Sequence, residues 1–131
     1  MDLKIKNKWV KALRSGKYKQ TKNILNGQGN FCCLGVLCDI SGQGEWTNNT
    51  NNMAGEYSGY LPHGIEVGSL ASLPYEVRDW AKMKSCNGKF EKYKWQIPGK
   101  ENTFCSLDLI NDNGASFEDI ANIIEKHWRE L

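Results

Sequence analysis

A run of nine residues, 12–20, combines side-chain types that bind phosphates and nucleobases. It reads Ala-Leu-Arg-Ser-Gly-Lys-Tyr-Lys-Gln, and its candidate binding residues are Arg14, Ser15, Tyr18, Lys19 and Gln20. An arginine fork can donate two parallel hydrogen bonds to a phosphate, an aromatic ring can stack on a base, and an amide can read a base edge. The alternative is structural: Tyr18 packs on the core, while Arg14 and Gln20 tie down the turn.

Aromatic residues elsewhere in the chain could complete such a site. The sequence has five Trp and five Tyr, and several lie in polar or lysine-rich surroundings: Trp46, Tyr57, Tyr60, Tyr93 and Trp95. Trp46 and Tyr60 belong to a stretch rich in Gly, Asn, Ser and Thr, residues 41–60, which predicts a long polar loop of the kind that is often functional. We therefore add Trp46 and Tyr60 to the candidate ligand-binding residues, together with Asn111 as a reader of polar edges.

Patterns for catalysis or metal binding are weaker. The five cysteines are an odd number, which does not suit a closed set of disulfides, and three of them lie in the apolar run 31–40, where free Cys behaves as a small hydrophobic residue. No Cys-x2-Cys or His-x3-His pair occurs, so zinc is not indicated. A Cys–His nucleophile with His127 is possible in principle, but nothing local marks one Cys as activated. We expect a protein that is not an enzyme and uses no metal or cofactor.

The formal net charge of +2 conceals four blocks of alternating sign. Counting Lys and Arg against Asp and Glu gives +7 for residues 1–23, −5 for 24–81, +5 for 82–100 and −5 for 101–131. The low total disfavours extended nucleic acid as a partner. The two basic segments could still converge on one small anion, or each could pair with an acidic segment of its own chain or of a neighbouring subunit.

The chain length and its local signals predict a single α+β domain over residues 1–131. We expect helices near the two ends of the sequence to pack on a small antiparallel sheet or hairpin. Asp2 is a candidate N-cap for the first helix, and Gly16 lies where a C-terminal glycine belongs. Ser116 and Asp119 form a capping box for the last helix.

Signals in the middle of the chain predict shorter elements. Residues 26–30, Asn-Gly-Gln-Gly-Asn, are typical of a hairpin tip. Residues 31–40 are too apolar for the surface and predict a short strand passing into a helix near Leu34. Pro74 is expected in the first turn of a short helix, and residues 90–97 show strand spacing.

The two predicted helices around Gly114 could also form a helix-turn-helix pair that reads DNA. The second of them carries Glu118, Asp119 and Glu125 before its only cations, and these acids would repel phosphates. No stretch approaches the roughly 20 apolar residues that span a bilayer, and no signal peptide is evident, so we expect a cytoplasmic protein.

Four segments match, in the same order, the pattern of a widespread family of small phage-encoded proteins. They are Trp9-x-x-Ala12-Leu13-Arg14-Ser15-Gly16-x-Tyr18-x-Gln20, Phe31-Cys32-Cys33-Leu34-Gly35-Val36-Leu37-Cys38-Asp39, Tyr60-Leu61-Pro62 and Leu109-Ile110-Asn111-Asp112-x-Gly114-x-Ser116-Phe117-x-x-Ile120-Ala121. The chain resembles phage anti-CBASS sponge proteins. The resemblance implies a homo-oligomer, a dimer or tetramer in the host cytoplasm during infection, that sequesters cyclic dinucleotides such as 3′3′-cGAMP without cleaving them.

Two functional classes follow. In the first, the protein is a sponge: Arg14 and Lys19 neutralise phosphates, Tyr18 or Trp46 stacks a base, and Gln20 or Asn111 reads polar edges. In the second, it is a non-enzymatic protein-interaction or DNA-binding phage regulator. An enzyme that degrades cyclic nucleotides is a third class.

Overall fold

The first helix begins and ends where its predicted capping residues, Asp2 and Gly16, indicated. The computed structural model describes residues 1–49 and 57–131. Helix α1 (Leu3–Arg14) begins at Asp2, whose carboxylate accepts hydrogen bonds from the backbone nitrogens of Lys4 and Ile5 at 2.9 and 3.1 Å. The helix ends at Ser15, and Gly16 follows with a φ of 73°, a conformation that glycine adopts without strain.

A tight hairpin follows, also as predicted. Strand β1 (Asn26–Gly27) pairs antiparallel with β2 (Asn30–Phe31). Gln28 and Gly29 connect the two strands, and their φ angles are positive, 53° and 78°. A two-residue turn with two positive φ angles has a twist that matches the twist of the flanking strands. The hairpin brings Phe31 beside the start of the next helix.

Two longer strands correct the expectation of a polar loop over residues 41–60. Strand β3 (Gly44–Asn49) pairs antiparallel with β4 (Tyr57–Pro62) across six residue pairs, and the sheet has the order β2-β1-β4-β3. The prediction was wrong there because Gly, Asn and Ser are poor local strand formers, while pairing with a partner strand decides the outcome. Residues 50–56 of that predicted loop lie outside the described residues.

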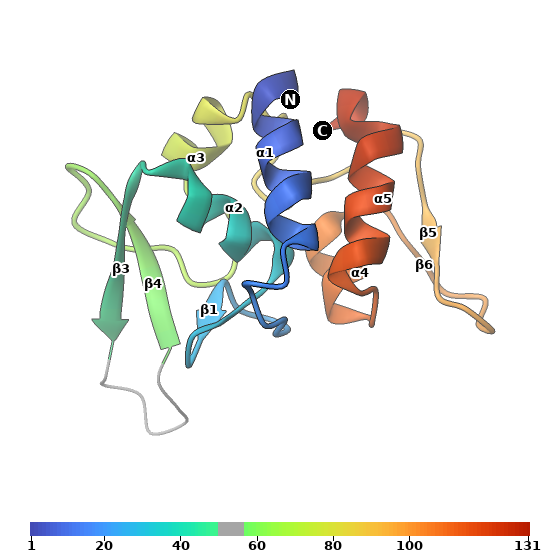
Figure 1. Cartoon of the computed structure of the whole chain (residues 1–131), viewed down its shortest axis with the longest axis horizontal. Helices are drawn as coiled ribbons and strands as arrows, with labels where there is room; N and C mark the ends of the chain where they lie inside the picture. The colour runs from blue at the N-terminus through green and yellow to red at the C-terminus, as the bar shows by residue number, and fades with distance from the viewer. Residues whose placement is uncertain (50–56) are drawn as a thin grey trace.

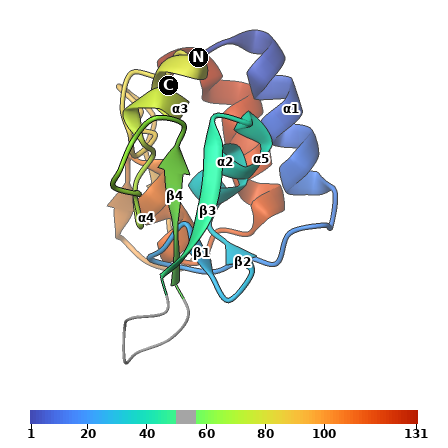
Figure 2. The same ribbon diagram turned by 90° about the vertical axis from the view of Figure 1, so that its left-hand side faces the viewer.

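Helix α2 (Cys33–Ser41) is the centre of the molecule. Seven of its nine residues are buried, as the apolar run 31–40 indicated. Figure 2 shows the sheet on one side of α2, with α1 and the C-terminal helix behind it. Gly35 allows this packing, because a Cβ atom there would lie 1.9 Å from the backbone oxygen of Leu25.

The second half of the chain begins with two short elements. Helix α3 (Tyr75–Trp80) starts directly after Pro74. Strands β5 (Trp95–Gln96) and β6 (Thr103–Phe104) form a second hairpin, so the strand predicted over residues 90–97 is confirmed only at its end. This hairpin projects from one end of the molecule, beyond the C-terminal helix (Figure 1).

The C-terminal part is helical. Helix α4 (Leu107–Asp112) leads into α5 (Phe117–His127), which begins with the predicted capping box of Ser116 and Asp119, and a 3-10 turn, η1 (Trp128–Glu130), follows. Helix α5 packs along α1. The result is the α+β fold expected, a small domain with helices at both ends of the chain and antiparallel sheets. No helix among the described residues is long and apolar enough to cross a membrane.

Candidate functional site

Asn111 lies at the centre of a buried polar cluster. Its side chain is 0% exposed. Its amide oxygen accepts hydrogen bonds from Gln20 Nε2 at 2.8 Å and from the backbone nitrogen of Cys33 at 3.2 Å, and its Nδ2 donates to the backbone oxygen of Thr21 at 2.9 Å. Gln20 Nε2 also donates to the oxygen of Ala115 at 2.8 Å. Both amides therefore fasten residues 20–21 to α2 and α4, and a ligand would have to break these bonds to reach them.

Arg14 is engaged by α5. Its Nε lies 3.2 Å from a Glu118 carboxylate oxygen and its Nη1 lies 3.1 Å from Glu125, while its Nη2 donates to Asn122 Oδ1 at 2.6 Å. The hydrogen bond and charge of Glu125 raise the pKa of Arg14 further above its usual range. This geometry is closer to the structural alternative, in which Arg14 and Gln20 tie down the turn, than to a phosphate site, because the guanidinium fork faces carboxylates of α5 and so fastens the end of α1 to that helix.

Four aromatic rings form a row from the end of α1 to the sheet. Tyr18 meets Phe31 at a centroid distance of 5.2 Å, Phe31 meets Trp46 at 5.5 Å, and Trp46 meets Tyr60 at 4.9 Å, each pair edge to face. Tyr60 is the inner end: it is 1% exposed, and its hydroxyl shares a hydrogen bond of 3.0 Å with Ser41. Tyr18, Phe31 and Trp46 are only partly buried, so these three members of the row are the ones that a ligand could reach.

Asp39 joins Tyr18 and Trp46. Its carboxylate accepts hydrogen bonds from the Tyr18 hydroxyl at 2.6 Å and from Trp46 Nε1 at 2.9 Å, one on each oxygen. Burial and this hydrogen bond raise the pKa of Tyr18, so its hydroxyl remains a donor at neutral pH. Sequence reasoning missed Asp39, although it is the one charged residue in the apolar run 31–40.

A basic pocket of about 300 Å³ opens beside Tyr18. Its lining consists of three lysines with polar and apolar neighbours: Lys8, Lys11, Ala12, Ser15, Lys17, Tyr18 and Ile40. Lys8 and Lys11 are one helical turn apart on α1, and Lys17 follows the turn at Gly16. No described residue forms an ion pair with any of the three lysines. Such a pocket can attract a small anion to cations that have no ion-pair partner among the described residues.

The structure therefore places the predicted binding residues in two groups. Ser15 and Tyr18 line the basic pocket, and Trp46 is linked to Tyr18 through Asp39. Arg14, Gln20 and Asn111 contact other parts of the chain, and the exposed Lys19 does not line the pocket. The three lysines were missed as site residues, although the spacing of Lys8 and Lys11 on the first predicted helix was a usable signal. The second basic segment, 82–100, contributes nothing to this pocket.

Two other kinds of site find no support in the geometry. Among the described residues, no group of three or more His, Cys, Asp or Glu side chains could hold a metal ion. Burial raises the pKa of Cys32 to about 11 and raises those of Cys33 and Cys38 as well, which is the opposite of an activated thiol. The α4 and α5 corner offers DNA an acidic helix, and two of its acids already bind Arg14.

The chain belongs to a family described as a domain of unknown function, DUF8296, whose sequence pattern matches residues 1–128. The match covers every helix described above apart from the final turn, η1. No curated protein and no solved structure matches the chain.

Proposed function

We propose that this protein is a phage immune-evasion sponge that binds cyclic dinucleotides, such as 3′3′-cGAMP, and sequesters them in the host cytoplasm without cleaving them. The observation that carries the proposal is the meeting, in one pocket, of Ser15 and Tyr18 with three lysines that have no ion-pair partner among the described residues. The resemblance of the sequence to anti-CBASS sponges supplies the ligand class.

In this proposal the lysines bind phosphate. The C-terminal end of α1 carries a partial negative charge that repels anions, so affinity depends on Lys8, Lys11 and Lys17 outweighing it. Ser15 adds little, because its hydroxyl donates to the oxygen of Ala12 at 2.6 Å. The partly buried rings of Tyr18 and Trp46, held by Asp39, provide apolar surface on which a base can rest. Sequestration needs no nucleophile or metal.

The size of the pocket favours a site completed by a second chain. Its volume of about 300 Å³ is at the lower end of ligand pockets, which range from roughly 300 to 1,000 Å³. A cyclic dinucleotide has two phosphates and two bases, more than this pocket encloses. The proposed protein is therefore a homo-oligomer, a dimer or tetramer, rather than a monomer.

A panel of cyclic di- and trinucleotides tests the function directly. Thermal shift of the purified protein is expected to identify at least one cyclic dinucleotide that stabilises it, because a ligand bound only by the folded state raises the unfolding temperature. After heat denaturation the nucleotide should be recovered intact by chromatography. Absence of a shift with every nucleotide would refute the sponge, and recovery of degraded nucleotide would replace it with an enzyme.

The lysine site is tested by changing Lys8, Lys11 and Lys17 together to Gln. Titration calorimetry should show affinity falling by about 100-fold or more, because each hydrogen bond to a charged group contributes about 1.5 kcal/mol or more. The matched control changes Lys22, Lys89 and Lys126 to Gln, which removes the same charge from exposed positions elsewhere. If both triple variants bind like the unchanged protein, the nucleotide site is not at this pocket.

A further inference from the structure

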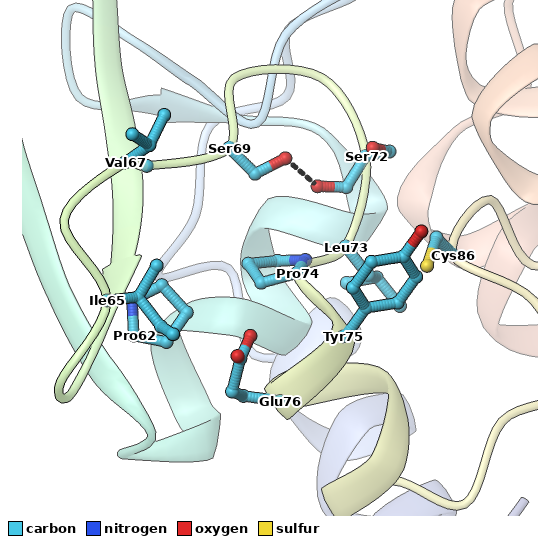
Figure 3. A pocket seen from close by; sticks show the side chains of 11 residues that line it. Pro62, Ile65, Val67, Ser69, Ser72, Leu73, Pro74, Tyr75, Glu76 and Cys86 are labelled. Carbon is cyan, nitrogen blue, oxygen red and sulfur yellow. Dashed lines mark hydrogen bonds between the residues drawn. The ribbon is translucent and has the colours of Figure 1, made fainter.

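A second pocket is lined by three of the six large apolar side chains that are exposed among the described residues. It has a volume of about 470 Å³ and lies between β4, the segment that follows it and α3. Three large apolar side chains on its lining are exposed, Ile65 at 41%, Val67 at 80% and Tyr75 at 67%. In Figure 3, Ile65 and Tyr75 stand on opposite sides of the pocket with Pro74 between them. A concentration of this kind marks an interaction surface more often than a solvated one.

The rim of this pocket is acidic. Glu76 lines it, and Glu66 is exposed between Ile65 and Val67. No described residue forms an ion pair with either glutamate. The neighbouring cation, Arg78, already pairs with Asp79 at 2.6 Å. The pocket therefore suits an apolar segment flanked by cations.

The hairpin of β5 and β6 has that character. Its connection contains Ile97 and Pro98, and Lys94 and Lys100 flank these two residues. The exposed Glu101 follows Lys100, so two lysines outweigh one glutamate in this segment. Both lysines are exposed, and no described residue pairs with them. Figure 1 places the hairpin at one end of the long axis of the molecule and the β4 and α3 region at the other. The hairpin thus cannot reach the pocket of its own chain.

We propose that this pocket binds the β5–β6 hairpin of a second copy of the chain. Ile97 and Pro98 of one copy enter the apolar pocket of the next, while Lys94 and Lys100 face Glu66 and Glu76. Because the two surfaces differ, the contact is head-to-tail and generates a ring or an open chain of subunits. It does not depend on nucleotide binding, and it uses none of the lysines of the basic pocket.

The mass of the protein in solution tests the contact. A hairpin in a pocket buries little surface, so we expect weak association that light scattering detects as a rise in mean mass between about 10 µM and 1 mM. Two charge-reversed variants test the two sides of the contact separately. Glu66→Lys with Glu76→Lys reverses the charge of the pocket rim, and Lys94→Glu with Lys100→Glu reverses the charge of the hairpin. Each variant alone should need about tenfold or more higher concentration to associate, because like charges now face each other.

An equimolar mixture of the two variants provides the decisive result. In the mixture a basic pocket meets an acidic hairpin, and an acidic pocket meets a basic hairpin, so association should return to the level of the unchanged protein. Val67→Asp should weaken association, whereas Leu109→Asp, at an exposed apolar residue on α4, should not. The proposal is overturned if the mean mass of the unchanged protein does not rise with concentration, if the variants associate like it, or if their mixture does not recover that rise. Circular dichroism confirms that each variant is folded.

Discussion

The Asn111 cluster and the basic pocket both contain polar side chains, and the two regions differ in whether these side chains have partners among the described residues. In the Asn111 cluster, each amide group has a partner within the chain, and Asn111 is fully buried. In the basic pocket, three lysines a few residues away in the sequence have no anionic partner among the described residues. The same nine-residue run, 12–20, contributes to both regions. Residue type therefore does not decide function here, and the presence or absence of an internal partner does.

The largest expected effect tests the structural side of this comparison. Asn111→Ala leaves the buried Cys33 nitrogen without its acceptor and removes the hydrogen bonds of Asn111 to Gln20 and Thr21, and should lower the free energy of unfolding by about 3 kcal/mol or more. Urea denaturation measures the loss. Asn7→Ala, at an exposed position on α1, is the control and should change stability little. A mild effect at Asn111 would mean that the cluster is not structural.

Gly35→Ala tests the packing of α2 beside that cluster. The added methyl group would lie 1.9 Å from the backbone oxygen of Leu25, so the helix or the segment before β1 must move. Overpacking of this kind should cost about 1–3 kcal/mol. The same denaturation experiment applies, and an unchanged midpoint would contradict the close approach.

A smaller, pH-dependent effect is expected at Tyr18, which lines the basic pocket. Its folded-state pKa is raised above the ordinary value of 10.0, so its contribution to stability is complete below pH 10 and is lost as the pH rises beyond that value. Tyr18→Phe should therefore make stability fall less steeply above pH 10, while losing the hydrogen bond to Asp39 at neutral pH. Unfolding midpoints measured from pH 8 upward compare the two proteins. Identical pH profiles would remove Tyr18 from this role.

The smallest expected effect on stability concerns the lysines of the basic pocket. Replacing Lys8, Lys11 and Lys17 by Gln should change the free energy of unfolding by no more than about 0.5 kcal/mol, because these side chains are exposed and unpaired. The same variant should lose nucleotide binding. Strong destabilisation would show that these lysines, like Asn111, serve the fold.

The sequence predicted what is local. Asp2 and Ser116 were identified as caps because a cap contacts backbone groups two or three residues away. The partners of Arg14 and Gln20 lie about ninety to one hundred residues further along the chain, at Glu118 and Asn111, and no local pattern encodes such a contact. Strands β3 and β4 were missed for the same reason, since pairing across residues 50–56 outweighs their weak strand propensity. To predict the basic pocket, one would have to know that the chain turns after Gly16 and places Lys17 beside α1.

The aromatic row gives this protein a built-in optical probe. Trp46 lies between Phe31 and Tyr60, and its indole nitrogen donates to the same carboxylate that receives the Tyr18 hydroxyl. A molecule that displaced Tyr18 from Asp39 would change the polarity around the indole. The emission spectrum of Trp46 would then shift, so occupancy of the pocket could be followed in real time without attaching a dye.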